Sequence, residues 1–423
     1  MTDFDAHRTI DAIWRIESAK LIAGLARMVY DVGLAEDLAQ DALVIALERW
    51  KDTGVPDNPS AWLMMTAKRR AIDQLRKNKL RDRKYEELGR DSELYTEPDL
   101  KPTMDGIGDD LLRLIFTTCH PVLSRESRVA LTLRLLVGLT TDEISHAFLV
   151  AESTVAQRIV RAKRTLTAAR VPFEVPEGDE LKDRLSSVLE VIYLMFNEGY
   201  TATTGGNWIR PLLCQEALRL GRVLAEIAPG ESEVHGLVAL MEIQSSRFKT
   251  RVSPTGEPIL LMDQNRALWD QLLIRRGLAA LERAQKLGCP LGPYALQATI
   301  AACHAQARTA SETDWARIAA LYEVLARATP SPVVELNRAV AIAMAFGPAF
   351  GLQIVDQLIS ESSLKGYHLL PSVRGDFLVK LGRIVEAREE FERAASLTRN
   401  EHERKILLRR AAECAANGRD NSV

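Results

Sequence analysis

Residues 152 to 170 constrain the fold of this chain more than any other stretch. Apolar side chains recur there at alternating steps of four and three, which predicts one buried stripe of a helix. These stripe residues are Val155, Ile159, Ala162, Leu166 and Ala169. The opposite side carries Thr154, Gln157, Arg158, Arg161, Arg164 and Thr165, and no acidic residue follows Glu152 before Arg170. The stretch therefore predicts an amphipathic helix with a polar and basic outward face.

A second, shorter amphipathic helix is predicted just upstream, over residues 140–148. Thr140 and Glu143 have the spacing of a capping box, which marks where this helix begins. Two short helices joined by a few residues, the second basic on its outer face, are typical of a helix-turn-helix that enters the DNA major groove. The alternative is an ordinary surface helix with a solvated basic face.

A second basic segment favours nucleic-acid binding over that alternative. Between residues 68 and 84 nine basic residues stand against Asp73 and Asp82, although the whole chain has a net charge of −2. Such a cluster neutralises phosphates and releases their counterions. The segment follows an apolar helix start that contains Trp62, on which bases can stack. The basic residues are Lys68, Arg69, Arg70, Arg76, Lys77, Lys79, Arg81, Arg83 and Lys84.

Together these motifs give the chain a family resemblance. Residues 8–170 resemble a bacterial RNA polymerase sigma factor of the extracytoplasmic-function type, within the sigma-70 family. Residues 33–50 resemble the region 2 helix that binds the polymerase clamp, and residues 62–76 resemble the helix that recognises and melts the −10 element. The helix-turn-helix is similar to region 4, which reads the −35 element. The tail after Val171 resembles the subfamily with a fused tetratricopeptide-type extension.

The resemblance implies partners and site residues. The partners are core RNA polymerase, through its β′ clamp and β flap, and promoter DNA, with a possible protein partner for the extension. The core-polymerase-binding residues would be Asp37, Gln40, Asp41 and Glu48. The −10 residues would be Asn58, Trp62, Lys68, Arg69, Arg70, Arg76 and Lys77. The −35 residues would be Glu152, Ser153, Thr154, Gln157, Arg158, Arg161 and Arg164.

Three positions depart from the family pattern. Arg69 stands where the family usually has Asn, and Ala151 stands where many members have a Ser cap or a Pro, which weakens the helix start by ~1 kcal/mol. The turn at 148–150 lacks the Gly found in many helix-turn-helix units. None of these changes the predicted architecture.

The clamp-binding helix is expected to have a buried side and an acidic side. Leu34, Leu38, Ala42, Ile45 and Ala46, extended by Leu47 and Trp50, would be buried. Glu36, Asp37, Gln40, Asp41 and Glu48 would form a polar, mostly acidic face. Such a face suits a basic protein surface and repels DNA, although a merely solvated face has the same pattern.

The chain is predicted to be all-α, with five parts. Residues 85–108 hold seven acidic residues against two basic ones. In the sigma-like interpretation this linker would pass near the polymerase active-site channel; otherwise it is a plain spacer. The parts are a region 2-like domain at 8–84, an acidic flexible linker at 85–108, a region 4-like domain at 109–170, a linker at 171–180 and a helical extension at 181–423.

The extension is predicted to be a tetratricopeptide-like α-solenoid, with a generic helical bundle as the alternative. Small and large residues near the end fall on positions of a 34-residue repeat. They are Gly375, Leu378, Gly382, Ala387, Phe391 and Ala394, and Trp315, Ile318, Ala319 and Tyr322 match the first-helix pattern. Stacked helix pairs bury a shared core and offer a groove to a partner. The segments 197–208 and 251–258 are expected to be loops, serving as contacts or as simple connections.

Catalysis, metal binding and cofactor binding are not expected. The chain has no Walker A loop, nucleophile elbow or HExxH motif, and its five cysteines form no CxxC pair, which fits a reducing cytoplasm. No apolar run approaches a membrane span, and the acidic residues 1–5 predict no signal peptide. Two other functions remain open. One is a helix-turn-helix regulator with a ligand- or partner-sensing helical domain, and the other is a scaffold without a role on DNA.

Overall fold

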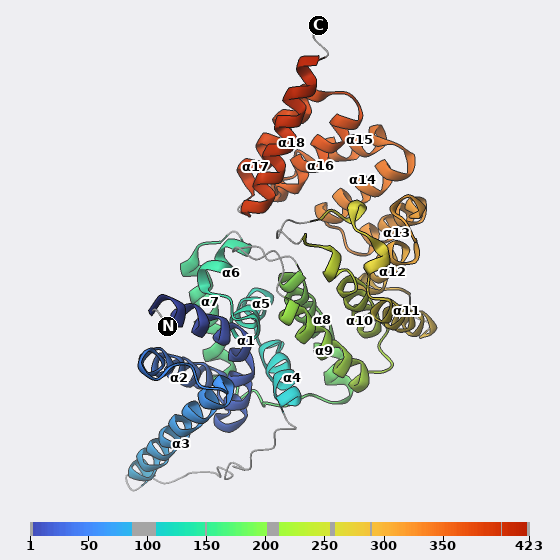
Figure 1. Ribbon diagram of the computed structural model, residues 1–423. Helices are drawn as coiled ribbons and strands as arrows, with labels where there is room; N and C mark the ends of the chain where they lie inside the picture. The colour runs from blue at the N-terminus through green and yellow to red at the C-terminus, as the bar shows by residue number, and fades with distance from the viewer. Residues whose placement is uncertain are drawn as a thin grey trace. The chain divides into compact units, whose positions relative to one another are not determined.

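The computed structural model describes residues 3–86, 107–148, 150–200, 211–253, 259–287, 290–398 and 400–420. These residues form helices joined by turns and loops, which confirms the predicted all-α class (Figure 1). They fall into two compact units, Met1–Met195 and Phe196–Val423. The division lies within α8 (Gly178–Tyr200), beyond the residue where the extension was predicted to begin.

The first three helices of unit 1 pack against one another: α1 (Asp3–Val29), α2 (Val32–Thr53) and α3 (Pro59–Glu86). Trp50 of α2 is 1% exposed, and its ring meets the ring of Trp62 of α3 edge-on at 5.2 Å. Side chains cap the two later helices. Asp31 accepts the backbone N–H of Leu34 at 2.8 Å, and Asn58 accepts the backbone N–H of Ala61 at 3.0 Å. Both caps satisfy donors that have no partner within the helix.

The rest of unit 1 holds α4 (Ile107–Thr118), α5 (Arg125–Thr132), the π-helix η2 (Leu133–Val137), α6 (Thr141–Phe148) and α7 (Glu152–Ala168). Helix α1 packs on α4 and η2, so both halves of unit 1 share one core. The first turns of α8 join this unit as well. Arg128 of α5 donates to the Ser187 hydroxyl, and Arg125 pairs with Glu190 at 2.8 Å.

Unit 2 is a succession of helices in which each one contacts the next (Figure 1). Short 3-10 helices lie in the connections: η3 (Phe248–Thr250), η4 (Leu261–Asp263), η5 (Arg266–Leu268), η6 (Ala310–Glu312) and η7 (Ser362–Leu364). This arrangement is that of an α-solenoid. Its α-helices are α9 (Pro211–Ile227), α10 (Ser232–Ser245), α11 (Gln271–Lys286), α12 (Pro293–Gln306), α13 (Trp315–Ala328), α14 (Pro332–Phe346), α15 (Pro348–Leu358), α16 (Leu369–Lys380), α17 (Ile384–Leu397) and α18 (Glu401–Asp420).

The small and large residues predicted near the end of the chain meet as expected. A Cβ on Gly375 of α16 would lie 2.8 Å from the ring of Phe391 on α17, so a glycine is what allows this close approach. Leu378 and Phe391 are both fully buried at 0% exposure. The packing supports the tetratricopeptide-like interpretation of this helix pair.

A half-buried carboxylate joins two helices near the start of unit 2. Glu233 on α10 accepts the backbone N–H groups of Tyr294 at 2.8 Å and Ala295 at 3.2 Å, in the first turn of α12. A Cβ on Gly292 would lie 2.4 Å from the Glu233 carboxyl carbon, so a larger residue there would displace the carboxylate from this cap. Burial raises the pKa of Glu233, although the backbone donors oppose that shift. Glu233 therefore orients α12 from a neighbouring helix.

Some predicted boundaries differ from the structure. Residues 197–200 are the last turn of α8 rather than the start of a loop, so the helix continues through Gly199. The remainder of that segment, most of the predicted acidic linker and residues 254–258 lie outside the described residues. Within the parts that are described, no helix is both long and apolar enough to cross a membrane.

Candidate nucleic-acid interface

Helix α7 has the two faces that its sequence predicted. Val155, Ile159, Ala162 and Leu166 are buried. Ala169, expected on the same stripe, is exposed because it lies just beyond the end of the helix. Ser153, Gln157, Arg161 and Arg164 are exposed, and Thr154 and Arg158 are half-buried beside them. Steps of four, four and three residues place the exposed side chains along one face.

Two features stabilise the helix-turn-helix: the predicted capping box at the start of α6, and a hydrogen bond between α6 and α7. The Thr140 backbone N–H donates to Glu143 Oε2 at 2.8 Å, and the Glu143 N–H donates to Thr140 Oγ1 at 3.1 Å. Ala151 makes no side-chain cap, as expected. Glu152 instead accepts the Thr141 hydroxyl at 2.8 Å, which ties the start of α7 to α6. This contact engages Glu152, one of the residues assigned to the −35 set.

The C-terminal half of α7 contacts α2. Lys163 forms an ion pair with Glu36, and the Thr167 hydroxyl donates to Asp31 Oδ2 at 2.9 Å. Glu36 also accepts Arg134 Nε of η2 at 3.1 Å and the Gln40 amide at 2.8 Å. Glu36 therefore binds two cations of the predicted region 4-like domain, and Asp31 adds a second link between the two predicted domains.

The prediction that Glu36 lies on an exposed acidic face is wrong, since the residue is 4% exposed. A buried carboxylate needs compensating positive charge, and Arg134 and Lys163 supply it. Neither cation is near Glu36 in sequence, so the local pattern of α2 carried no sign of the contact.

The other residues assigned to the polar face of α2 differ in exposure and in whether they form side-chain contacts. Asp37 and Glu48 are exposed, while Gln40 is half-buried and donates to Glu36. Asp41 pairs with Arg70 of α3 at 2.5 Å, with side chains that are 52% and 46% exposed. A pair this open contributes ~0–1 kcal/mol, so it opposes the release of either side chain only weakly. A core-binding candidate and a −10 candidate therefore contact each other in this structure.

The −10 candidates are spread along α3. Trp62 is half-buried against Trp50, and Lys68 is half-buried, whereas Arg69, Arg70, Arg76 and Lys77 are exposed. Steps of seven residues, from 69 to 76 and from 70 to 77, return to the same side of a helix. The exposed cations therefore gather on one side of α3. Asn58 lies at the helix N-terminus, where its side chain caps α3.

No cluster of His, Cys, Asp and Glu that could hold a metal ion occurs among the described residues. Cysteines 119, 214, 303 and 414 are buried free thiols, and burial raises the pKa of Cys119 and Cys214 to about 12. They are therefore uncharged thiols at neutral pH.

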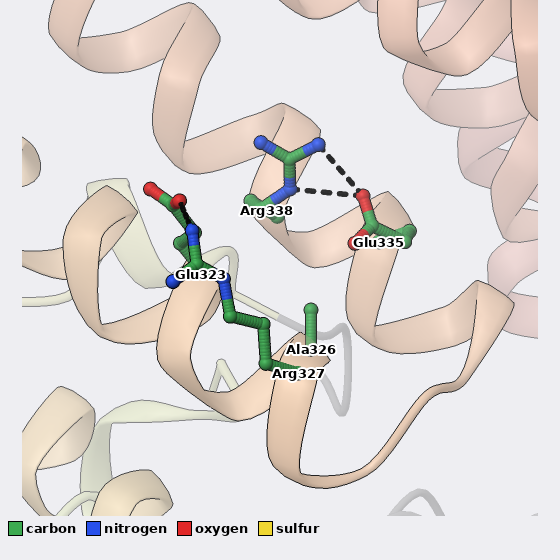
Figure 2. Close-up of a pocket in the computed structure, with 5 residues that line it drawn as sticks. All are labelled: Glu323, Ala326, Arg327, Glu335 and Arg338. Atoms are coloured by element: carbon green, nitrogen blue, oxygen red, sulfur yellow. Dashed lines mark hydrogen bonds and ion pairs between the residues drawn. The ribbon is translucent and has the colours of Figure 1, made fainter.

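A pocket of about 250 Å³ lies between α13 and α14 (Figure 2). Its charges already pair with each other, Arg338 with Glu335 at 2.8 Å and Arg327 with Glu323. This leaves little net charge to attract a ligand.

These observations define a helix-turn-helix protein with a second basic helix, next to aromatic residues, in the same unit. Residues 16–81 match sigma-70 region 2, and residues 113–166 match sigma-70 region 4. Residues 184–285 match a family of unknown function, DUF6596. The chain belongs to the sigma-70 family as an extracytoplasmic-function sigma factor.

Relatives of this chain include proteins named as sigma factors. An uncharacterized protein of Rhizobium meliloti, R00370, is 41% identical over 385 residues, which cover 90% of each chain. The probable ECF RNA polymerase sigma factor SigI of Mycobacterium tuberculosis is 27% identical over 174 residues, 40% of this chain and 58% of that one. The ECF RNA polymerase sigma factor SigK of a Mycobacterium species is 26% identical, covering 36% of this chain and 80% of its own.

Among solved structures, yeast Tom70 aligns with 92% of this chain and 82% of its own length. Its TM-score is 0.33 and its sequence identity is 10%, a likeness too low to bear on the fold.

Proposed function

We propose that α7 reads the −35 element, that α3 captures the melted −10 strand, and that α2 binds the polymerase clamp. Membership of the sigma-70 family makes the chain a factor that directs RNA polymerase to promoters. The observation that carries the residue assignment is the exposed polar and basic face of α7 on a fully formed helix-turn-helix. Sigma factors act as specificity subunits, so we assign no catalytic step to this chain.

In the −35 complex, Gln157 and Arg161 would enter the major groove. Arg donates two hydrogen bonds to the O6 and N7 atoms of guanine, whereas Gln donates one hydrogen bond to N7 of adenine and accepts one from its N6 amino group. Arg161 is exposed and Arg158 is half-buried, so Arg161 is the freer of the two to reach a base. Arg161→Ala should cost about 1–3 kcal/mol of promoter binding if it contacts a base.

Fluorescence anisotropy with promoter fragments tests this assignment. Arg170→Ala, at an exposed arginine two residues beyond the end of α7, is the matched control and should bind as the wild type does. If Arg161 contacts only a phosphate, Arg161→Ala would weaken binding to all DNA sequences equally. It would also reduce the slope of log K against log salt concentration by about one released counterion. Unchanged binding by Arg161→Ala would show that this face does not meet DNA.

In the open complex, Trp62 and the cations of α3 would hold the unpaired strand. Stacking on an aromatic ring contributes ~1–3 kcal/mol per base, and neighbouring cations neutralise phosphates. Trp62 is already half-exposed at the start of α3, before the basic run. The double variant Arg69→Ala/Arg70→Ala should therefore reduce strand opening more than core binding.

Permanganate footprinting of the melted strand measures this effect. Arg393→Ala changes an exposed arginine of α17 and serves as the control. A wild-type footprint from the Arg69/Arg70 variant would reject the −10 assignment.

The acidic residues of α2 would contact the β′ clamp, and the helix-turn-helix domain would contact the β flap. Asp37 and Glu48 are exposed on one helix and present negative charge to a basic partner. Asp37→Lys should weaken binding to core polymerase at least tenfold in a competition assay. The affinity of the variant for isolated promoter fragments should be unchanged. We place this activity in the cytoplasm, where RNA polymerase works.

The extension would regulate these contacts by docking on the sigma domains or by recruiting a protein partner. Because α8 contributes Ser187 and Glu190 to unit 1, a truncation should keep this helix and end after residue 200. In run-off transcription with core polymerase, the amount of transcript made with the full chain and with the chain that lacks residues 201–423 should differ several-fold. Equal output would make the extension a passive appendage. A regulator that is not a sigma factor would fail to support initiation in either form.

A further inference from the structure

Three arginines gather in unit 2 where α10 ends. The guanidinium groups of Arg247 and Arg266 each lie 5.4 Å from the ring centroid of Trp269. Arg251 lies 3.5 Å from the ring centroid of Tyr200, whose hydroxyl donates to Gln244 at 2.7 Å. Burial lowers the pKa of both Arg251 and Arg266, and the charge of Arg247 lowers both further. The cluster therefore concentrates positive charge in a partly dehydrated place.

Arg266 has a structural role that accounts for its charge. It donates to the carbonyl oxygens of His304 at 2.9 Å and Ala307 at 3.3 Å, and to the Thr313 hydroxyl at 2.9 Å. Those carbonyls end α12, where the helix dipole stabilises a cation. Arg266 is thus a cap for α12.

Arg247 is not accounted for in this way. Its Nε donates to Gln264 at 3.1 Å and its Nη1 donates to Gln244 at 3.0 Å, so its polar partners are neutral amides. Among the residues that the structure describes, no carboxylate forms an ion pair with it. It lies two residues past the end of α10, where the dipole supplies only about half a negative charge. A half-buried guanidinium in such surroundings still favours an anion.

Arg247 lines a cavity of about 180 Å³ between α10 and α12. His304, Gln244, Gln297 and Tyr322 also line it, together with apolar side chains, and none of the described lining residues is acidic. Within the described part of the chain, His304 Nδ1 is buried and has no hydrogen-bond partner, and the His304 ring lies edge-on against the Trp315 ring at 5.1 Å. The cavity thus joins an uncompensated cation to a buried ring nitrogen that has no partner.

We propose that this cavity binds a small oxyanion, a carboxylate or a phosphate, through Arg247 and His304. Arginine is suited to the task because its planar donors match the spacing of carboxylate and phosphate oxygens. The cavity is smaller than the ~300–1,000 Å³ of sites that enclose drug-sized ligands. Its occupant is therefore a compact anion and not a nucleotide.

The electrostatics of His304 agree with this assignment. Burial, and then the charges of Arg247 and Arg266, lower the pKa of His304 to about 4. The imidazole is therefore neutral at neutral pH, and in the tautomer with a proton on Nδ1 it donates that proton to a bound oxygen. An anion in the cavity would offset the repulsion between Arg247 and Arg266. The proposal concerns unit 2 alone and does not depend on the residue assignments in unit 1.

Isothermal titration of the full chain tests the proposal with four probes: inorganic phosphate, sulfate, acetate and succinate. Each is compared with sodium chloride at equal ionic strength, because salt also screens the arginine cluster. We expect saturable binding by at least one probe, and the preferred probe separates a phosphate site from a carboxylate site. Absence of saturable binding by all four would overturn the proposal.

Two variants locate the binding. Arg247→Gln should weaken the apparent Kd of the preferred probe at least tenfold, and His304→Asn should weaken it several-fold. Arg276→Gln, at an exposed arginine of α11, should bind as the wild type does. Far-UV circular dichroism checks that each variant is folded, and if Arg247→Gln is not, His304→Asn decides the outcome. Wild-type affinity in a folded Arg247 or His304 variant would place the anion elsewhere and overturn the proposal.

Discussion

Replacing Glu36 with Gln should loosen the contact between α2 and α7. The carboxylate accepts Arg134 Nε at 3.1 Å and pairs with Lys163, and it is the charge that these two cations share. Gln keeps the size and one acceptor oxygen but removes the negative charge. Arg134 and Lys163 would then face each other across a neutral amide.

The exposure of the three side chains sets the magnitude. The side chain of Glu36 is 5% exposed, whereas those of Arg134 and Lys163 are 29% and 21% exposed. Breaking a fully buried pair costs ~3–5 kcal/mol, and breaking a surface pair costs ~0–1 kcal/mol. The partly solvated cations place this case between the two, at about 2 kcal/mol. At ~1.4 kcal/mol per factor of ten, the local opening equilibrium should rise about 30-fold.

Hydrogen–deuterium exchange of the full chain measures this opening directly. Peptides covering the first turns of α2 and the last turns of α7 should both exchange faster in Glu36→Gln. Asp52→Asn, an exposed acid-to-amide change on the same helix, is the matched control. The double variant with Lys163→Met should lose less than the sum of the single changes. If exchange of both segments stays within twofold of the wild type, Glu36 does not join the two domains.

Three further outcomes are expected. Neutral His304 contributes up to ~3 kcal/mol of stability, which is present above its unfolded pKa of about 6.5 and is lost as the pH falls to about 4. In urea unfolding measured over a pH series, the free energy of unfolding should depend less on pH in His304→Asn than in the wild type. The same pH dependence in both proteins would contradict this linkage. Thr140→Ala removes half of the capping box and should cost ~1 kcal/mol, seen as faster amide exchange at the start of α6 but not of α4. Gly375→Ala forces a Cβ against Phe391, and the overpacking should lower the free energy of unfolding by ~1–3 kcal/mol, measured as a lower thermal midpoint. Adding Phe391→Leu should relieve this loss; no relief would mean that the ring is not the obstacle.

Local signals in the sequence predicted local structure well. The capping box at Thr140 forms as expected, the apolar stripe of α7 is buried except at its last residue, and Gly375 lies against Phe391. Each of these features depends on residues a few positions apart or on a repeat with a known period. The helical class followed from such patterns, and the sigma-like domains followed from the resemblance of the motifs to a known family.

Contacts between distant segments could not be predicted in this way. Glu36 and Arg134 are 98 residues apart, and nothing in the periodicity of α2 distinguishes Glu36 from the exposed Asp37. The cap at Asn58 is a local contact, and its signal is present in the sequence. Asn followed by Pro is typical of a helix start and indicates the cap that the structure contains. The assignments of side chains to core polymerase and promoter DNA stay predictions.

The cap that Glu233 makes on α12 has a consequence for how unit 2 comes apart. In a solenoid each repeat contacts only its neighbours, so the stack frays from its ends. Glu233 joins α10 to α12, and α11 contacts both, so these three helices form a block that melts together. Helices α13 to α18 follow mainly as a chain of neighbours. Heat or force should therefore unfold α10, α11 and α12 in one step rather than one helix at a time.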